Sequence, residues 1–260
     1  KKSSRFQKMC GGFLCGKLAV VTGGSGTIGQ AIAKALVSSG ASVVLTARRP
    51  EKLASVKDEI LEGWNGHSIP HIYCIASDVS KEESVVELFQ KIDGLSQGID
   101  LLINNAGIMV PGATVELSAS DMERVLSVNV LGPFLCAREA MKRMKVAGSG
   151  RIINISSISS MSPRPHSVTY TTSKHALQGS SRSLALDGRP YGIAVGAIHP
   201  GNVVSELLDP EVIAQREATE GFIRPEDVAA CVLTMASLPY SANILDLTVL
   251  PTKQPLVGRG

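Results

Sequence analysis

The sequence has no long hydrophobic run and little net charge. None of its apolar stretches reaches the roughly 18 residues that cross a membrane. Lysine and arginine number 26 against 23 for aspartate and glutamate, a net charge of +3, and they are scattered along the chain. Neither nucleic acid nor a membrane is therefore expected as a partner. Charged residues at 19% and hydrophobic residues at 44% also exclude a disordered or fibrous protein.

Cysteine is scarce, with five residues and no CxxC pair. Cys10 and Cys15 lie close together but lack a second pair to complete a zinc site, so no metal is expected. An odd number of thiols favours free cysteines in a reducing, cytoplasmic location. The apolar stretch from Cys10 to Leu14 is too short for the hydrophobic region of a signal peptide.

Short apolar runs alternate with amphipathic segments along the chain. Seven runs are predicted to be strands, at residues 17–22, 42–47, 71–76, 99–103, 151–155, 193–198 and 244–250. Helices are predicted at residues 27–38, from 50, at 81–93, from 119 to 129, and at 133–146, 169–187 and 225–237. Continuous apolar strands are typical of sheets covered on both faces. The pattern predicts an α/β fold: one doubly wound, seven-stranded parallel sheet, Rossmann-like, with helices on both faces.

The domain organisation is expected to be simple. Residues 1–16 are predicted to be a flexible N-terminal extension, and residues 17–260 a single domain. The only long irregular stretch covers residues 201–223. Residues 206–220 within it are helix-prone and amphipathic, so we expect a lid over a binding site rather than a domain boundary.

A glycine-rich turn joins the first predicted strand to the first helix. Gly24, Gly26 and Gly29 fit the GxGxxG pattern, whose glycines allow a tight turn and let the backbone approach a pyrophosphate at a helix N-terminus. A plain turn between strand and helix is the alternative. The position of the glycines at the start of a βαβ unit favours nucleotide binding.

The end of the second strand bears on which nucleotide binds. An NAD site usually has an acidic residue there to bind the ribose hydroxyls, and Ala47 cannot do so. Arg48 and Arg49 follow, and a guanidinium can pair with a 2′-phosphate. Two solvated arginines at a helix start are the alternative. The missing acid and the added bases together favour NADP over NAD.

Tyr170 and Lys174 lie four residues apart on a predicted helix and so share one face. A lysine charge about 4 Å from the phenol contributes roughly 4 kcal/mol, which would lower a phenol pKa of about 10 towards 7. General acid–base catalysis is efficient at that value. Ser157 lies at the carboxyl end of the strand at 151–155, the edge where open α/β sheets bind ligands.

These features together resemble one known family. The chain is similar to the short-chain dehydrogenase/reductases, in the single-domain branch of about 250 residues. The resemblance extends from Lys17 to Leu250 and rests on the turn at 22–29, Asp78-Val79, residues 104–107, Asn129 with Gly132, Ser157, Tyr170 with Lys174, and Pro200-Gly201. The tail at residues 245–252 departs from the branch's common ending and is closer to the serine or 3-hydroxy-acid dehydrogenases.

The resemblance implies four catalytic residues: Ser157, Tyr170, Lys174 and Asn129. Tyr170 would donate a proton to a carbonyl oxygen that Ser157 also binds. Lys174 would lower the pKa of Tyr170 and hold the ribose. Asn129 would kink its helix and hold a water that relays protons to Lys174. Asn104 is expected to tie neighbouring strands together, and no ligand role is expected for His199.

The resemblance also implies a cofactor site. Asp78 and Val79 would contact adenine, residues 105–107 the adenosine side, and Val203 and Ser205 the carboxamide. The complete set is Gly23, Ser25, Gly26, Thr27, Ile28, Gly29, Arg48, Arg49, Asp78, Val79, Asn105, Ala106, Gly107, Tyr170, Lys174, Pro200, Gly201, Val203 and Ser205.

Position 27 departs from the family's glycine pattern, which has glycines at 23, 27 and 29. We expect Gly26 to adopt the unusual backbone angles in its place. Thr27 would then be the helix N-cap, with its hydroxyl turned towards a phosphate. The alternative is that Thr27 obstructs the site and weakens or abolishes cofactor binding.

The predicted function is an NADP(H)-dependent oxidoreductase that interconverts a carbonyl and a secondary alcohol. The same chemistry with NAD(H), or a non-catalytic dinucleotide-binding regulator, are the alternatives. The substrate-lining candidates favour an apolar-bodied ketone; they are Met109, Ser159, Met161, His166, Leu207 and Leu208. By family habit the chain is expected to form a homotetramer or a dimer.

Overall fold

One parallel sheet of seven strands forms the centre of the protein. The computed structural model describes residues 12–64, 70–95, 98–205, 208 and 210–257. The strand order is β3-β2-β1-β4-β5-β6-β7, and neighbouring strands pair in parallel. The strands are β1 Leu18–Thr22, β2 Ser42–Ala47, β3 Ile72–Ala76, β4 Leu101–Asn104, β5 Gly150–Ile155, β6 Ile193–Pro200 and β7 Asp246–Val249. The predicted fold class is confirmed, and strand ends differ from prediction by at most two residues.

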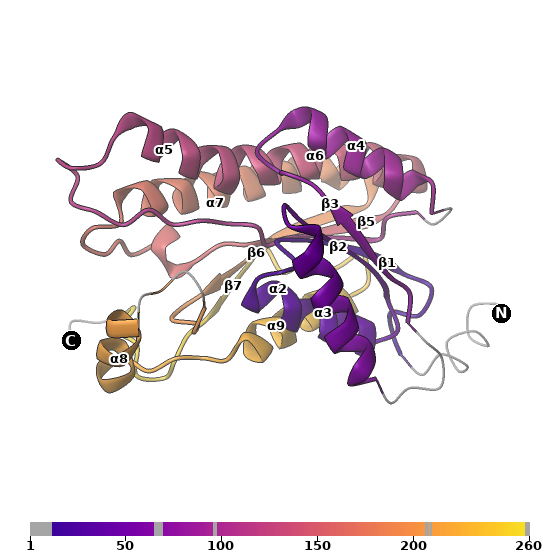
Figure 1. Cartoon of the computed structure of the whole chain (residues 1–260). Coiled ribbons are helices and arrows are strands. Elements are labelled where there is room, and N and C mark those ends of the chain that lie inside the picture. The colour runs from indigo at the N-terminus through magenta and orange to yellow at the C-terminus, as the bar shows by residue number, and fades with distance from the viewer. Residues whose placement is uncertain (1–11, 65–69, 96–97, 206–207, 209, 258–260) are drawn as a thin grey trace.

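Helices cover both faces of the sheet (Figure 1). One face packs against α2 Thr27–Ser38, α3 Pro50–Glu62 and α9 Pro225–Ser237. The other packs against α4 Glu82–Asp93, α6 Gly132–Ala147 and α7 Val168–Gly188. The shorter helices are α5 Ala119–Leu126, α8 Pro210–Thr219 and the single turns η2 Ile158–Ser160 and η3 Arg189–Tyr191. In the described segments no helix combines the length and apolar character needed to cross a membrane.

The continuous apolar strands follow from this two-sided burial. In β1, Ala19 and Val21 belong to the core under α2, while Leu18 and Val20 belong to the core on the opposite face. Successive side chains of a strand point to opposite faces, so a strand covered on both sides is mostly apolar at every position. Leu14 also packs into the first core, and its amide donates to the Ser39 carbonyl at 2.9 Å.

The helices predicted at 119–129 and 133–146 form one continuous rod. A π-helical turn, η1 Ser127–Leu131, connects α5 to α6. Such turns insert one residue into a helix and occur often at functional sites. Asn129 lies within this turn, which is the irregularity that the family resemblance implied. The rod begins at Ser118, which caps the helix: its hydroxyl accepts from the Asp121 amide at 3.2 Å.

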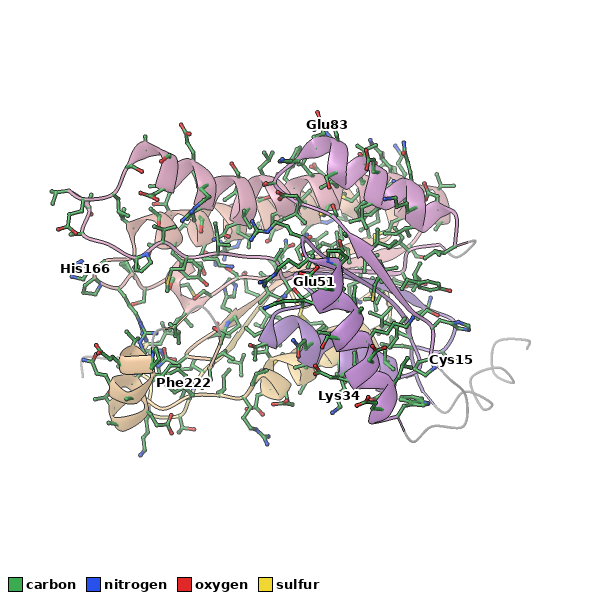
Figure 2. All side chains as sticks on the ribbon, viewed as in Figure 1. Cys15, Lys34, Glu51, Glu83, His166 and Phe222 are labelled. Atoms are coloured by element: carbon green, nitrogen blue, oxygen red, sulfur yellow. The ribbon has the colours of Figure 1, made fainter. Side chains whose placement is uncertain are left out.

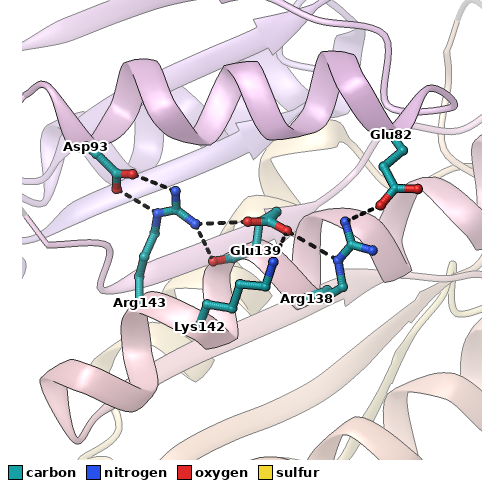
Figure 3. Close-up of polar contacts among 6 residues, drawn as sticks. All are labelled: Glu82, Asp93, Arg138, Glu139, Lys142 and Arg143. Carbon is teal, nitrogen blue, oxygen red and sulfur yellow. Dashed lines mark hydrogen bonds and ion pairs between the residues drawn. The ribbon is translucent and has the colours of Figure 1, made fainter.

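A buried carboxylate connects α4 to α6 (Figure 3). Glu139 lies within 3.2 Å of Arg138, Lys142 and Arg143, and Arg143 continues to Asp93 on α4 at 2.6 Å. Burial opposes the charge of Glu139, but hydrogen bonds from Lys142 and Arg143 outweigh it and lower its pKa. The network therefore stabilises the ionised carboxylate at neutral pH.

Glu139→Gln is expected to destabilise the protein by about 1.5–3 kcal/mol at neutral pH, the usual contribution of hydrogen bonds to a charged group. Urea unfolding measures the change. The matched control is Glu82→Gln, because Glu82 pairs with the same Arg138 but is exposed; it should cost less than about 1 kcal/mol. An equal loss of unfolding free energy in the two variants would show that the buried Glu139 contributes no more to stability than the exposed Glu82.

Candidate active site

The main cavity lies where the strand order reverses, between the carboxyl ends of β1 and β4. Open α/β sheets bind ligands at this switch point. The cavity volume is about 720 Å³. It brings together nearly all the residues predicted for the site, namely Gly23, Ser25, Gly26, Thr27, Ile28, Arg48, Arg49, Asp78, Val79, Asn105, Ala106, Gly107, Ser157, Tyr170, Lys174, Pro200, Gly201, Val203 and Ser205. Gly29 and Asn129 lie behind this surface.

The glycine turn differs in detail from the prediction. Gly23 has the left-handed backbone, with φ 63°, and a Cβ there would lie 2.8 Å from the Ala106 Cα. Gly26 has ordinary extended angles, so the expectation that it adopts unusual ones was wrong. Gly26 is the N-cap, and Thr27 is the first helical residue and lines the cavity, so the N-cap assignment of Thr27 was also wrong. The chain reverses at Gly23, whose carbonyl accepts from the Gly26 amide at 3.1 Å, and residues 24–29 have no positive φ.

Thr22 and Asn105 fix the glycine turn to the loop that follows β4. The Thr22 hydroxyl accepts from the amides of Asn105 and Ala106, both at 3.0 Å. The Asn105 side chain donates to the carbonyls of Thr22 and Gly23 at 3.1 and 3.2 Å. Gly29 packs below, where a Cβ would lie 2.2 Å from the Gly23 oxygen. The turn is therefore rigid, and its position relative to α2 requires glycine at both 23 and 29.

The end of β2 presents two arginines. Ala47 is partly buried on the cavity wall, and Arg48 and Arg49 beside it are exposed and line the same cavity. In the part of the chain that the structure describes, neither guanidinium has an ion-pair partner. Both are available to an anion at this end of the cavity.

Ser157, Tyr170 and Lys174 lie at the other end of the cavity. Ser157 follows β5, and its hydroxyl accepts from the Ser159 amide at 3.1 Å. Lys174 is buried one turn after Tyr170 on α7. Its Nζ donates to the Ile155 carbonyl at 2.9 Å and lies 5.3 Å from the centre of the Tyr170 ring.

Burial sets the acid–base properties of the pair. It raises the pKa of Tyr170 to about 12, an effect that the neighbouring Ser157 hydroxyl opposes. Burial also lowers the pKa of Lys174 to about 8. The prediction that Lys174 lowers the pKa of Tyr170 towards 7 is wrong for the protein without nucleotide. The lysine lies against the ring and is bonded to a backbone carbonyl, and both groups have lost water, which the four-residue spacing does not show.

Asn129 connects the π-turn to the catalytic helix. Its side chain accepts from the Ile108 amide at 2.8 Å and donates to the Ile108 carbonyl at 2.9 Å. It also donates to the Ser173 hydroxyl at 3.0 Å, and that hydroxyl donates to the Tyr170 carbonyl at 2.7 Å. Asn129 therefore positions the turn of α7 that carries Tyr170. Its expected role in holding a water stays a prediction.

Asn104 and His199 are buried polar residues of the sheet. Asn104 on β4 donates to Asn154 on β5 at 2.9 Å, which confirms that it ties neighbouring strands together. His199 is fully buried and bridges Ser160 and Asp246, with both contacts at 2.9 Å. Ser160 in turn donates to the Ser157 carbonyl at 2.6 Å. His199 therefore supports the backbone of Ser157 from below, a role that its sequence position did not indicate.

The substrate-lining predictions are confirmed in part. Met109, Ser159, His166 and Leu208 line the cavity. Met161 does not, and its side chain is exposed, because the η2 turn directs it outwards. Leu207 lies outside the described residues. Figure 2 shows His166, before α7, and Phe222, after α8, at the same end of the molecule.

Sequence reasoning missed two arginines on the cavity wall. Arg164 lies on the segment between Ser157 and Tyr170, and Arg216 lies on α8. Helix α8 falls within the stretch predicted as a helical lid, and Val212 and Arg216 on it line the cavity. Closure of this lid stays a prediction. The position of Arg164 between two catalytic candidates was the available signal.

The fold and cavity define a Rossmann-like α/β domain in which a glycine turn and a serine–tyrosine–lysine group share one site. A family model described as short chain dehydrogenase matches residues 17–215. The chain therefore belongs to the short-chain dehydrogenase/reductase family of oxidoreductases.

Individual relatives agree over nearly the whole chain. Dehydrogenase/reductase SDR family member 11 of Homo sapiens is 35% identical over 92% of this chain and 95% of its own length. Farnesol dehydrogenase of Aedes aegypti is 34% identical over 91% and 96%. A crystal structure of a metagenomic short-chain oxidoreductase in complex with NADP has a TM-score of 0.78 and 32% identity, covering 92% of this chain and 99% of that one.

Proposed function

We propose that this protein is an NADP(H)-dependent oxidoreductase that interconverts a carbonyl and a secondary alcohol. The observation that carries the proposal is the shared cavity, which has the Ser157, Tyr170 and Lys174 group at one end and the exposed Arg48 and Arg49 at the other. The related oxidoreductase with bound NADP supports the choice of cofactor.

The residues of the cavity fit a dinucleotide. Ser25, Gly26 and Thr27 line the cavity at the N-terminus of α2, where backbone amides can bind a phosphate. Asp78 and Val79 would lie against the base, and Arg48 would pair with a 2′-phosphate. The bound nicotinamide supplies or accepts the hydride.

The protein's own groups provide the proton and the orientation. With a pKa of about 12, Tyr170 keeps its proton at neutral pH and is therefore suited to donate it to a carbonyl oxygen. Ser157, which lines the cavity with the phenol, would hold the same oxygen. The Lys174 ammonium would stabilise the phenolate formed after transfer. Asn129 keeps this part of α7 in place through Ser173.

The test is NADPH consumption by the purified protein with a panel of neutral and anionic ketones and aldehydes. Turnover with at least one carbonyl, absent without it, supports the proposal. Tight NADPH binding with no turnover for any member would favour the non-catalytic regulator instead.

Arg48→Ala is expected to weaken NADPH binding about 10- to 100-fold and to leave NADH binding nearly unchanged, because hydrogen bonds to a charged phosphate contribute about 1.5–3 kcal/mol. Calorimetric titration with both nucleotides measures this. Lys34→Ala, on the face of α2 outside this cavity, is the control. An equal loss of affinity for NADPH and NADH would show that Arg48 does not contact the 2′-phosphate. If the parent protein binds NADH more tightly than NADPH, the NAD alternative is favoured.

We also propose a homotetramer or a dimer in a cytoplasmic location. Apolar side chains are exposed along the rod and α7: Leu131, Phe134 and Leu186. A second copy would cover them, since exposed apolar patches often mark interfaces. The described cysteines are free thiols, as suits a reducing compartment.

Light scattering is expected to give a mass of two or four chains of 27.3 kDa. Phe134→Glu should shift the mass towards the monomer, because it places a charge in the apolar contact. Val115→Glu, at a highly exposed position on a loop, is the control and should not change the mass. A monomer for the parent at micromolar concentration would exclude the assembly.

A further inference from the structure

Two arginines of the cavity wall and a single carboxylate lie close together. Arg164 donates to the Glu220 Oε2 atom at 2.6 Å, and Arg216 donates to the Asn202 side-chain oxygen at 3.5 Å. The two guanidinium groups and the one carboxylate give 2 − 1 = +1. Arg164 and Arg216 line the cavity and Glu220 does not, so the surplus positive charge faces the cavity.

Glu220 is held away from the cavity by buried partners. Its Oε2 atom also accepts from Asn202 at 2.8 Å and from Gln254 at 3.0 Å. Both amides are buried, and the Asn202 backbone donates to the Gln254 side-chain oxygen at 2.9 Å. The carboxylate is therefore held by Arg164 and the two amides, and among the described residues its ion pair is with Arg164 and not with Arg216.

Arg216 is left with little compensation. The one hydrogen bond of its guanidinium group in the described part of the chain is the 3.5 Å contact with a neutral amide. Burial and the neighbouring Arg164 lower its pKa, with Glu220 opposing them, so its charge is held at a cost. A guanidinium in this situation binds a planar carboxylate well, because its N–H groups match the two oxygens.

The positive charge of Arg164 and Arg216 lies in the same cavity as the catalytic group. Arg164 is seven residues after Ser157 and six before Tyr170 on one connecting segment. Arg216 enters from α8, and the wall of the same cavity also carries Met109, Leu208 and Val212. We propose that the physiological substrate is a carbonyl compound with an apolar body and a carboxylate, which Arg164 and Arg216 bind. This inference rests on the proposed oxidoreductase function.

Binding without turnover tests the site directly. Hexanoate and hexanamide, and benzoate and benzamide, are titrated into the protein with and without saturating NADP. These pairs differ mainly in charge. We expect each carboxylate to bind at least about tenfold more tightly than its amide in the parent. Arg216→Met should abolish this preference, Arg216→Lys should restore part of it, and the exposed Arg224→Met should leave it unchanged.

The outcomes separate the inference from the proposed function. Equal binding of acid and amide, no saturable binding of either acid, or a preference that survives in Arg216→Met would overturn the inference. So would a loss of NADPH affinity in Arg216→Met, because the arginine would then serve the nucleotide. Acetoacetate and methyl acetoacetate complete the test: reduction of the ester with no preference for the acid contradicts the inference alone, and NADPH binding without reduction of any carbonyl contradicts the proposed function.

Discussion

Tyr170→Phe is expected to lower turnover by about 10²- to 10⁴-fold, the usual contribution of a positioned acid or base. NADPH affinity should change little, because the phenol acts on the reacting oxygen in the transition state rather than in docking. The phenylalanine ring keeps the packing of α7 against Lys174, so the fold should persist. Steady-state kinetics, together with calorimetric titration of NADPH, separates the two effects.

The control for this variant is Tyr191→Phe. Tyr191 lies in η3, is partly exposed and is outside the cavity, so its hydroxyl has no expected part in the reaction. Its loss should leave turnover unchanged. Turnover of Tyr170→Phe within tenfold of the parent would contradict the assignment of Tyr170 as the proton donor.

Lys174→Met is expected to lower turnover to a similar extent and, unlike most substitutions in a core, to stabilise the protein without nucleotide. The Lys174 side chain is buried, and burial lowers its pKa from 10.5 to about 8. This fall corresponds to about 3 kcal/mol of unfavourable free energy for burying the charge. Methionine fills a similar volume without a charge but loses the hydrogen bond to the Ile155 carbonyl, so a net gain of about 1–3 kcal/mol is expected at pH 7.

The pH dependence of that gain identifies its cause. Between about pH 8 and 10.5 the folded parent binds fewer protons at Lys174 than the unfolded chain does, so the parent becomes more stable as pH rises. The advantage of Lys174→Met should therefore be complete below pH 8 and disappear towards pH 10.5. Urea unfolding of both proteins at pH 7 and pH 10 measures it. A variant less stable than the parent at pH 7, or a difference independent of pH, would contradict a buried charge at Lys174.

The sheet was predictable because local composition determines it. β1 is a short apolar run between Gly16 and Gly23, and β2 is one between Gly40 and Pro50. Both faces of these strands are covered, which requires apolar residues on each side. The rod of α5 and α6 was predicted as two helices, because the residues around Gly132 contain both a glycine and a proline. The structure instead accommodates Gly132 against Val79, where a Cβ would lie 2.9 Å from a methyl group.

The parts of the site that sequence reasoning missed depend on contacts between distant segments. His199 meets Ser160 and Asp246 only because β5, β6 and β7 are adjacent, and no spacing in the chain signals it. The four-residue interval of Tyr170 and Lys174 correctly placed both on one face of α7. It could not show that burial, rather than their mutual field, dominates both pKa values. Arg164 and Arg216 likewise come together only when α8 lies across the cavity.

The most direct test of the central claim follows the hydride itself. The protein is mixed with NADPH that carries deuterium at C4 of the nicotinamide and with the panel of carbonyl compounds, and the products are analysed by mass spectrometry. The proposed function predicts an alcohol with deuterium on the former carbonyl carbon, formed by the parent and strongly reduced in Tyr170→Phe. Binding of NADPH with no deuterated alcohol from any carbonyl, or equal formation by Tyr170→Phe, would contradict it.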